Sequence, residues 1–168
     1  DYSAGAQPLF VSAGLIDGDA LLDLAVVNYG SSDGSVFAST SVFLQNPNTL
    51  GDFLPPSHYV TGIRSEEVAI TDLDLDNLTD LVVVNSMQMN VDGFPTGSLS
   101  VLLQNTITDL SFQGRTDYPS IFQPLSIATG DLNSDSYPDI VVADDGVLVL
   151  FQKPDNPGYF YPVIRAGG

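Results

Sequence analysis

The sequence contains no cysteine and no tryptophan, one histidine, and 4 Lys+Arg residues against 21 Asp+Glu residues. Without cysteine, neither disulfide bonds nor thiolate metal sites can form. One imidazole, His58, cannot build a zinc site of several histidines and leaves little for Ser-His-Asp catalysis. The formal net charge of −17 repels phosphate groups. We therefore expect no nucleic-acid partner and no insertion into an anionic membrane.

Long hydrophobic runs are also missing. No stretch of about 18 apolar residues could span a membrane, and the first residues lack the basic start and apolar stretch of a signal peptide. We expect a secreted or cell-surface protein whose leader has been removed or lies upstream of this segment. Hydrophobic residues make up 43% of the chain and charged residues 15%. This balance favours a folded domain over disorder.

An internal repeat is the main positive signal. Three segments align: GLIDGDALLDLAVVN from Gly14, ITDLDLDNLTDLVVVN from Ile70 and TGDLNSDSYPDIVVAD from Thr129. The sequences SVFLQN, SVLLQN and LVLFQK follow them, and a tyrosine precedes each copy in register. The repeat predicts one domain of three units, at about 1–57, 58–116 and 117–168.

Each unit has the pattern of strands and turns, with no sustained helical periodicity. An apolar stretch leads into an acidic loop, and a β-branched run and a third apolar strand follow. We expect a short fourth strand centred on Phe53, Phe112 or Phe160. Four short strands in repeated units of about 50 residues are typical of propeller blades. The predicted fold is all-β, with three four-stranded antiparallel β-propeller blades in an incomplete ring. A two-sheet sandwich is the alternative, but it does not explain the repeat.

The acidic loops place oxygen side chains at their first, third, fifth and ninth positions. Ca²⁺ prefers about six to eight oxygen ligands, and Mg²⁺ suits such a flexible cage less well. A backbone carbonyl at the seventh position would add a ligand. In the first loop Leu15 replaces the first ligand, so we expect weak binding or an empty loop there. Capping of solvated turns is the alternative role for these residues. The predicted ligands are Asp72, Asp74, Asp76, Leu78 and Asp80 in the second loop, Asp131, Asn133, Asp135, Tyr137 and Asp139 in the third, and Asp17, Asp19 and Asp23 in the weaker first.

The D-x-[DN]-x-D-x-x-x-D loop followed by a hydrophobic strand resembles FG-GAP/VCBS repeats. These are Ca²⁺-binding blades of integrin α-chain-type propellers and of many secreted bacterial proteins. The resemblance covers nearly the whole chain and implies metal ligation by the acidic residues of these loops. Two departures stand out: Asn77 and Ser136 replace a common glycine, and such propellers usually have about seven blades.

Three blades leave two open edges. We expect either a fragment of a longer propeller or a chain that associates with further blades or other copies through these edges. The end of the chain, YFYPVIRAGG, reads as the opening strand of a fourth unit.

The expected function is an extracellular Ca²⁺-stabilised module for protein interaction, adhesion or structural assembly, and not an enzyme. One alternative is a lectin-like propeller that binds glycans between blades, with Tyr2, Tyr59 and Tyr118 as platforms. Another is a non-catalytic ancillary domain of a secreted hydrolase. Residues 30–34 match the G-x-S-x-G nucleophile pattern but lack its strand-to-helix context. Connections at about 28–41 and 85–100 carry aromatic and methionine side chains that could contact a protein or a sugar: Tyr29, Phe37, Met87, Met89 and Phe94.

Overall fold

The computed structural model describes residues 1–31, 36–89, 95–106, 110–119, 124–162 and 164–165. All regular structure in these ranges is β-strand, and none of it is helical. Accordingly, the described residues include no helix that could cross a membrane.

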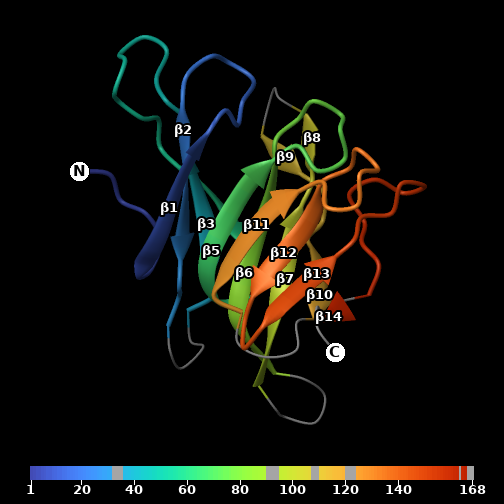
Figure 1. Ribbon diagram of the computed structural model, residues 1–168. Coiled ribbons are helices and arrows are strands. Elements are labelled where there is room, and N and C mark those ends of the chain that lie inside the picture. Colours follow the sequence, from blue (N-terminus) through green and yellow to red (C-terminus); the bar gives the residue numbers. More distant parts are fainter. Residues whose placement is uncertain (32–35, 90–94, 107–109, 120–123, 163, 166–168) are drawn as a thin grey trace.

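Three antiparallel sheets of four strands form the body of the molecule (Figure 1). The first sheet contains β1 (Pro8–Gly14), β2 (Asp23–Asn28), β3 (Ser39–Phe43) and β4 (Ser57–Val60). The second contains β5 (Ile63–Thr71), β6 (Asp80–Met89), β7 (Pro95–Leu102) and β10 (Thr116–Pro119). The third contains β11 (Ser126–Gly130), β12 (Asp139–Ala143), β13 (Val147–Leu150) and β14 (Ile164–Arg165). The predicted all-β fold of three four-stranded repeats is confirmed, and we call these sheets the first, second and third blades.

The predicted position of the fourth strands is wrong. Phe53 and Phe160 form isolated bridges to Gln45 and Gln152, and the second blade has the equivalent hairpin of β8 (Gln104–Thr106) and β9 (Ser111–Phe112). The true fourth strands follow these hairpins. They are short and partly polar because they form the outer edge of each sheet, so no apolar run marks them.

The end of the chain also differs from its prediction. Ile164 and Arg165 pair with Val149 and Leu148 of β13. These residues are therefore the fourth strand of the third blade and not the opening of a fourth unit.

The blades stack face to face, and the second blade is buried on both sides. Its central strand has four consecutive apolar side chains, Leu81 to Val84, that are all 0% exposed. Leu81 and Val83 pack in a cluster with side chains of the first blade. Val82 and Val84 pack in a cluster with side chains of the third. Consecutive apolar residues thus mark a strand covered on both faces.

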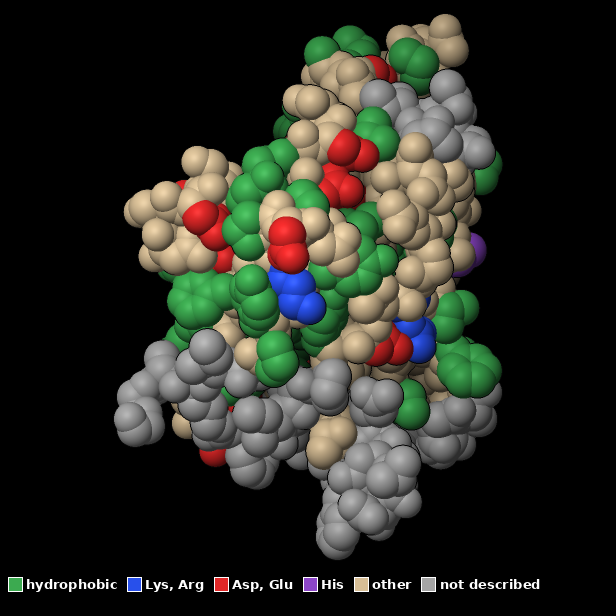
Figure 2. Space-filling view, turned by 90° about the vertical axis from the view of Figure 1, so that its right-hand side faces the viewer, with side chains coloured by type: hydrophobic (Ala, Val, Ile, Leu, Met, Phe, Trp, Pro, Cys, Tyr) green, Lys and Arg blue, Asp and Glu red, His purple; other side chains and the backbone are tan. Residues whose placement is uncertain are grey.

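This stacking sets where the loops lie. The first strands β1, β5 and β11 lie side by side (Figure 1). Because all blades have the same order and direction, their acidic loops gather at one end of the molecule together with the hairpins that precede the fourth strands. On the side shown in Figure 2, hydrophobic side chains reach the surface among polar ones, and the cationic areas are small.

Candidate metal site

The ninth residue of each acidic loop is a buried aspartate that ties the loop to the hairpin. Asp80 is 1% exposed. Its Oδ2 accepts the N–H of Leu73 at 2.7 Å, and its Oδ1 accepts the N–H of Gln104 at 2.8 Å. The same two bonds recur from Ile16 and Gln45 to Asp23, and from Leu132 and Gln152 to Asp139. Each carboxylate therefore acts as a clamp, whether or not it also contacts an ion.

The third and fifth residues coil the loop around their own side chains. In the second loop the N–H of Asp76 donates to Asp74 Oδ1 at 3.2 Å, and the N–H of Leu78 donates to Asp76 Oδ1 at 2.8 Å. Such turns are a common use of aspartate and asparagine. Both bonds recur between Asp17, Asp19 and Leu21, and between Asn133, Asp135 and Tyr137.

The first residue separates the loops into two classes. Asp72 Oδ2 accepts the N–H of Asn77 at 3.0 Å, and Asp131 Oδ2 accepts the N–H of Ser136 at 2.9 Å. Both donors have positive φ, 68° and 74°, so the residues that replace glycine do adopt the turn conformation. Leu15 has no side-chain oxygen to make this bond in the first loop.

A group of three carboxylates lies in the second loop. One oxygen each from Asp72, Asp74 and Asp80 lie within 4.8 Å of one another, so the group could hold a metal ion. The Oδ1 atom of Asp72 is buried and has no hydrogen-bond partner among the described residues. A buried carboxylate oxygen without a partner is costly, and a cation would satisfy it. The residues present thus fit a hard cation.

The electrostatics of this group point the same way. Burial raises the pKa of Asp80 to about 7, with Asp74 and Asp76 adding to the shift and the N–H groups of Gln104 and Leu73 opposing it. Burial also raises the pKa of Asp74, and the neighbouring charge of Asp76 adds to it. In the first loop, burial likewise raises the pKa of Asp17. Crowded carboxylates therefore resist full ionisation in the absence of a cation.

The third loop is bonded more fully within itself. Asp131 Oδ1 accepts the N–H of Ser134 at 2.7 Å and that of Asp135 at 3.2 Å. The side-chain amide of Asn133 donates to Asp135 Oδ2 at 3.0 Å. These bonds bring Asp131, Asn133 and Asp135 together, but among the described residues the third loop has no close group of three carboxylates like that of the second. An amide also replaces one carboxylate, so the negative charge is lower than in the second loop. Ligation by the carbonyls of Leu78 and Tyr137 stays a prediction.

Neighbouring loops are joined by side chains to which the sequence analysis assigned no role. Thr79 Oγ1 in the second loop donates to the carbonyl of Leu15 in the first at 2.7 Å. Gln152 Nε2 in the third blade donates to the carbonyl of Leu73 in the second loop at 2.9 Å. Gln152 belongs to the repeated segments SVFLQN, SVLLQN and LVLFQK. This repetition was the feature of the sequence that could have indicated its structural role.

The tyrosines predicted as glycan platforms pack edge-on against the hairpin phenylalanines. The Tyr59 ring lies 4.7 Å from the Phe112 ring between centroids, and its hydroxyl donates to the carbonyl of Leu110 at 2.7 Å. Equivalent pairs join Tyr2 to Phe53 and Tyr118 to Phe160. Tyr59 and Tyr118 thereby hold one blade to the next.

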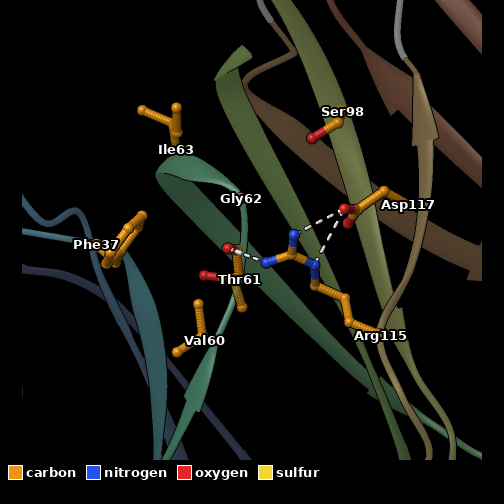
Figure 3. A pocket seen from close by; sticks show the side chains of 8 residues that line it. All are labelled: Phe37, Val60, Thr61, Gly62, Ile63, Ser98, Arg115 and Asp117. Atoms are coloured by element: carbon orange, nitrogen blue, oxygen red, sulfur yellow. Dashed lines mark hydrogen bonds and ion pairs between the residues drawn. The ribbon is translucent and has the colours of Figure 1, made fainter. Parts of the chain in front are cut away.

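A cavity of about 260 Å³ lies where the first blade meets the second (Figure 3). Its apolar side is formed by Phe37, Val60 and Ile63, and its polar side includes Arg115 and Asp117. The guanidinium lies 2.8 Å from Asp117 Oδ2 and also donates to the carbonyl of Thr61. Phe37 is 72% exposed. Tyr29, also expected on a long connection, does not line this cavity. The side chains of Met87, Met89 and Phe94 lie outside the described part of the structure.

Among the described residues, His58 pairs with a serine outside the G-x-S-x-G match. His58 Nδ1 lies 2.8 Å from Ser41 Oγ, and Ser41 is 0% exposed. Residues 32–34 of the G-x-S-x-G match lie outside the described residues.

Comparison with known proteins bears on the repeat. Residues 72–142 match the family model described as FG-GAP-like repeat, from the first predicted ligand of the second loop into β12. No curated protein matches the chain. An FG-GAP-like repeat suggests a β-propeller-type interaction module. The match, the repeated acidic loops and the three antiparallel blades support the FG-GAP/VCBS repeat assignment that the sequence predicted.

Proposed function

We propose that this chain is an extracellular, Ca²⁺-stabilised propeller module for protein interaction, adhesion or structural assembly, without enzymatic activity. The observation that carries the proposal is the carboxylate group of the second loop, with its buried, unpartnered Asp72 oxygen. An oxygen-only set of acidic ligands suits Ca²⁺ better than softer metals.

In this proposal the ion contributes charge compensation and no chemical step. Asp72, Asp74 and Asp80 would hold it in the second loop, and Asp76 and the Leu78 carbonyl would complete the set. Asp131, Asn133, Asp135, Asp139 and the Tyr137 carbonyl would do the same in the third. Because the clamp aspartates also bond the hairpins, an ion in a loop would stiffen the whole end of its blade.

The absence of activity and the extracellular location are supported by separate features. Ser41, whose hydroxyl pairs with the single histidine, is 0% exposed, so a substrate could not reach it. Extracellular Ca²⁺ modules work with dissociation constants of about 10⁻⁴ to 10⁻³ M, a range that fits short loops with few ligands.

Calorimetric titration of the EDTA-treated chain with Ca²⁺ tests the proposal directly. We expect heat of binding, a rise in melting temperature at millimolar Ca²⁺, and a smaller response to Mg²⁺. Asp72→Asn together with Asp131→Asn should remove most of the response. Asp155→Asn, an exposed carboxylate outside the acidic loops, is the matched control. Absence of both heat and thermal shift in the unmodified chain would reduce the loops to solvated turns.

A second candidate function, glycan binding, is supported by the cavity between the first two blades. An exposed aromatic ring beside an Arg–Asp pair is a combination that can stack on a sugar and hydrogen-bond its hydroxyls. Binding on a glycan array that disappears with Phe37→Ala and persists with Leu50→Ala would favour this function. No binding to any glycan would remove it.

A further inference from the structure

Each terminal blade has one apolar face against which no other blade packs among the described residues. We call Leu9, Val11, Leu24 and Val26 the first-blade face, and Val141, Ala143, Val147 and Val149 the third-blade face. The pairings of Val11 with Val26 and of Val141 with Val149 place the members of each pair on one side of their sheet. Val11 is 56% exposed, and Val147 is 47% exposed.

The second blade shows what normally covers these positions. Val68 corresponds to Val11 in the repeat but is only 2% exposed, because it packs toward the first blade. Leu99 corresponds to Val147 but is 1% exposed, because it packs toward the third. The two terminal faces are therefore the two halves of a contact that the chain already makes twice within itself.

The chemistry of the faces supports this equivalence. Neither face contains a charged side chain, although the chain has 21 Asp+Glu residues. The first-blade face is also hollowed, with a cavity of about 200 Å³ lined by Leu9, Val11 and Val26 among others. Uncharged apolar faces of this kind on a strongly acidic protein mark contact surfaces.

We propose that the partner of these faces is a second copy of this chain, with the third-blade face of one copy packed on the first-blade face of the next. Such a contact is heterologous, so copies add head to tail and either close a ring or extend. The inference specifies the partner for the structural-assembly part of the proposed function. It rests on the blade stacking and needs no bound ion.

Sedimentation velocity over a wide concentration range tests the proposal, in a buffer of about 150 mM salt that screens the acidic charge. We expect the unmodified chain to form species larger than a monomer. Val11→Glu and Val147→Glu should each abolish association, because each puts a charge on one half of the contact. Leu50→Glu, at a 74% exposed position in a hairpin outside both faces, should leave it intact.

Mixing the two variants gives the decisive result. Head-to-tail contact predicts that Val11→Glu and Val147→Glu, each monomeric alone, form a heterodimer together, since one intact half remains on each. A monomer at every concentration would overturn the proposal and leave the faces to further blades or another partner. Loss of association with only one variant would also overturn it, because that result indicates contact between like faces.

Two controls keep these outcomes interpretable. Circular dichroism should be unchanged in all variants, since the substituted positions are exposed. Melting temperatures should also agree when all chains are compared at a concentration low enough that the unmodified chain is monomeric, because association itself stabilises the folded state. Each experiment should be run in EDTA and in millimolar Ca²⁺. Failure of self-association while Ca²⁺ still binds would count against the second copy alone and leave the metal proposal intact.

Discussion

The first and second acidic loops have the same internal framework but differ in the carboxylates that they bring together. Both are held by the turns at the third and fifth residues and by the buried clamp at the ninth. They differ at the first residue, where Leu15 replaces Asp72. The comparison shows that the path of the loop depends on the shared hydrogen bonds, whereas the crowding of carboxylates depends on one added acid.

The clamp should give the largest effect, and it should be the same in both loops. Asp80→Ala leaves the buried N–H groups of Leu73 and Gln104 unpaired, which should lower the free energy of unfolding by about 2 to 4 kcal/mol. Asp23→Ala should cost a similar amount by losing the bonds from Ile16 and Gln45. Urea denaturation in EDTA measures both. A large loss for Asp80→Ala with none for Asp23→Ala would show that the frameworks are not equivalent.

Exchange of the first residue should exchange the metal-binding behaviour. Asp72→Leu should weaken Ca²⁺ binding to the second loop by about tenfold or more, since one of few anionic ligands is lost. The free energy of unfolding of the Asp72→Leu variant in EDTA should be unchanged or higher, because one of the crowded carboxylate charges is removed. The reciprocal Leu15→Asp should add a binding event, measured as the number of ions bound by calorimetry. Unchanged stoichiometry in both variants would contradict the role assigned to this position.

The raised pKa of Asp80 should give the next largest effect, a dependence of stability on pH. Its folded-state pKa is about 7, against an ordinary value of 3.8. The folded state therefore binds the proton more tightly, and its stability in EDTA should increase as the pH falls from about 8 to 5. Saturating Ca²⁺ should reverse the trend, since protons compete with the ion. Melting temperature against pH measures this, and Asp80→Asn should flatten the profile in EDTA. A metal-free chain that becomes less stable as the pH falls over this range would contradict the raised pKa of Asp80.

The bond between the two loops should give the smallest effect. Thr79→Val removes the hydroxyl that donates to the carbonyl of Leu15 and should cost about 0.5 to 1 kcal/mol, since the bond is exposed to water. Ca²⁺ affinity should stay unchanged if the loops act independently. A change of severalfold in calorimetry would instead show that ion binding in one loop is coupled to its neighbour.

Local residue patterns were enough to predict the three repeats, the first three strands of each blade, and the acidic loops. Alternating acids and β-branched runs act over a few residues, so their structural meaning can be read without knowing the fold. The fourth strands could not be placed in this way. At a sheet edge, a segment such as Ser57–Val60 needs no apolar pattern, while Phe53 carries the apolar signal in the preceding hairpin.

The sequence by itself therefore determined the blade fold, the spacing of the loop oxygens, and which loop lacks an acidic first residue. Only the tertiary structure decided the roles that depend on distant partners. Asp80 is a clamp because folding brings Gln104, which is 24 residues away, to its carboxylate. Tyr59 is a link between blades because Phe112 meets its ring. Val68 is buried and Val11 exposed for the same reason: stacking covers one repeat position and leaves its equivalent open.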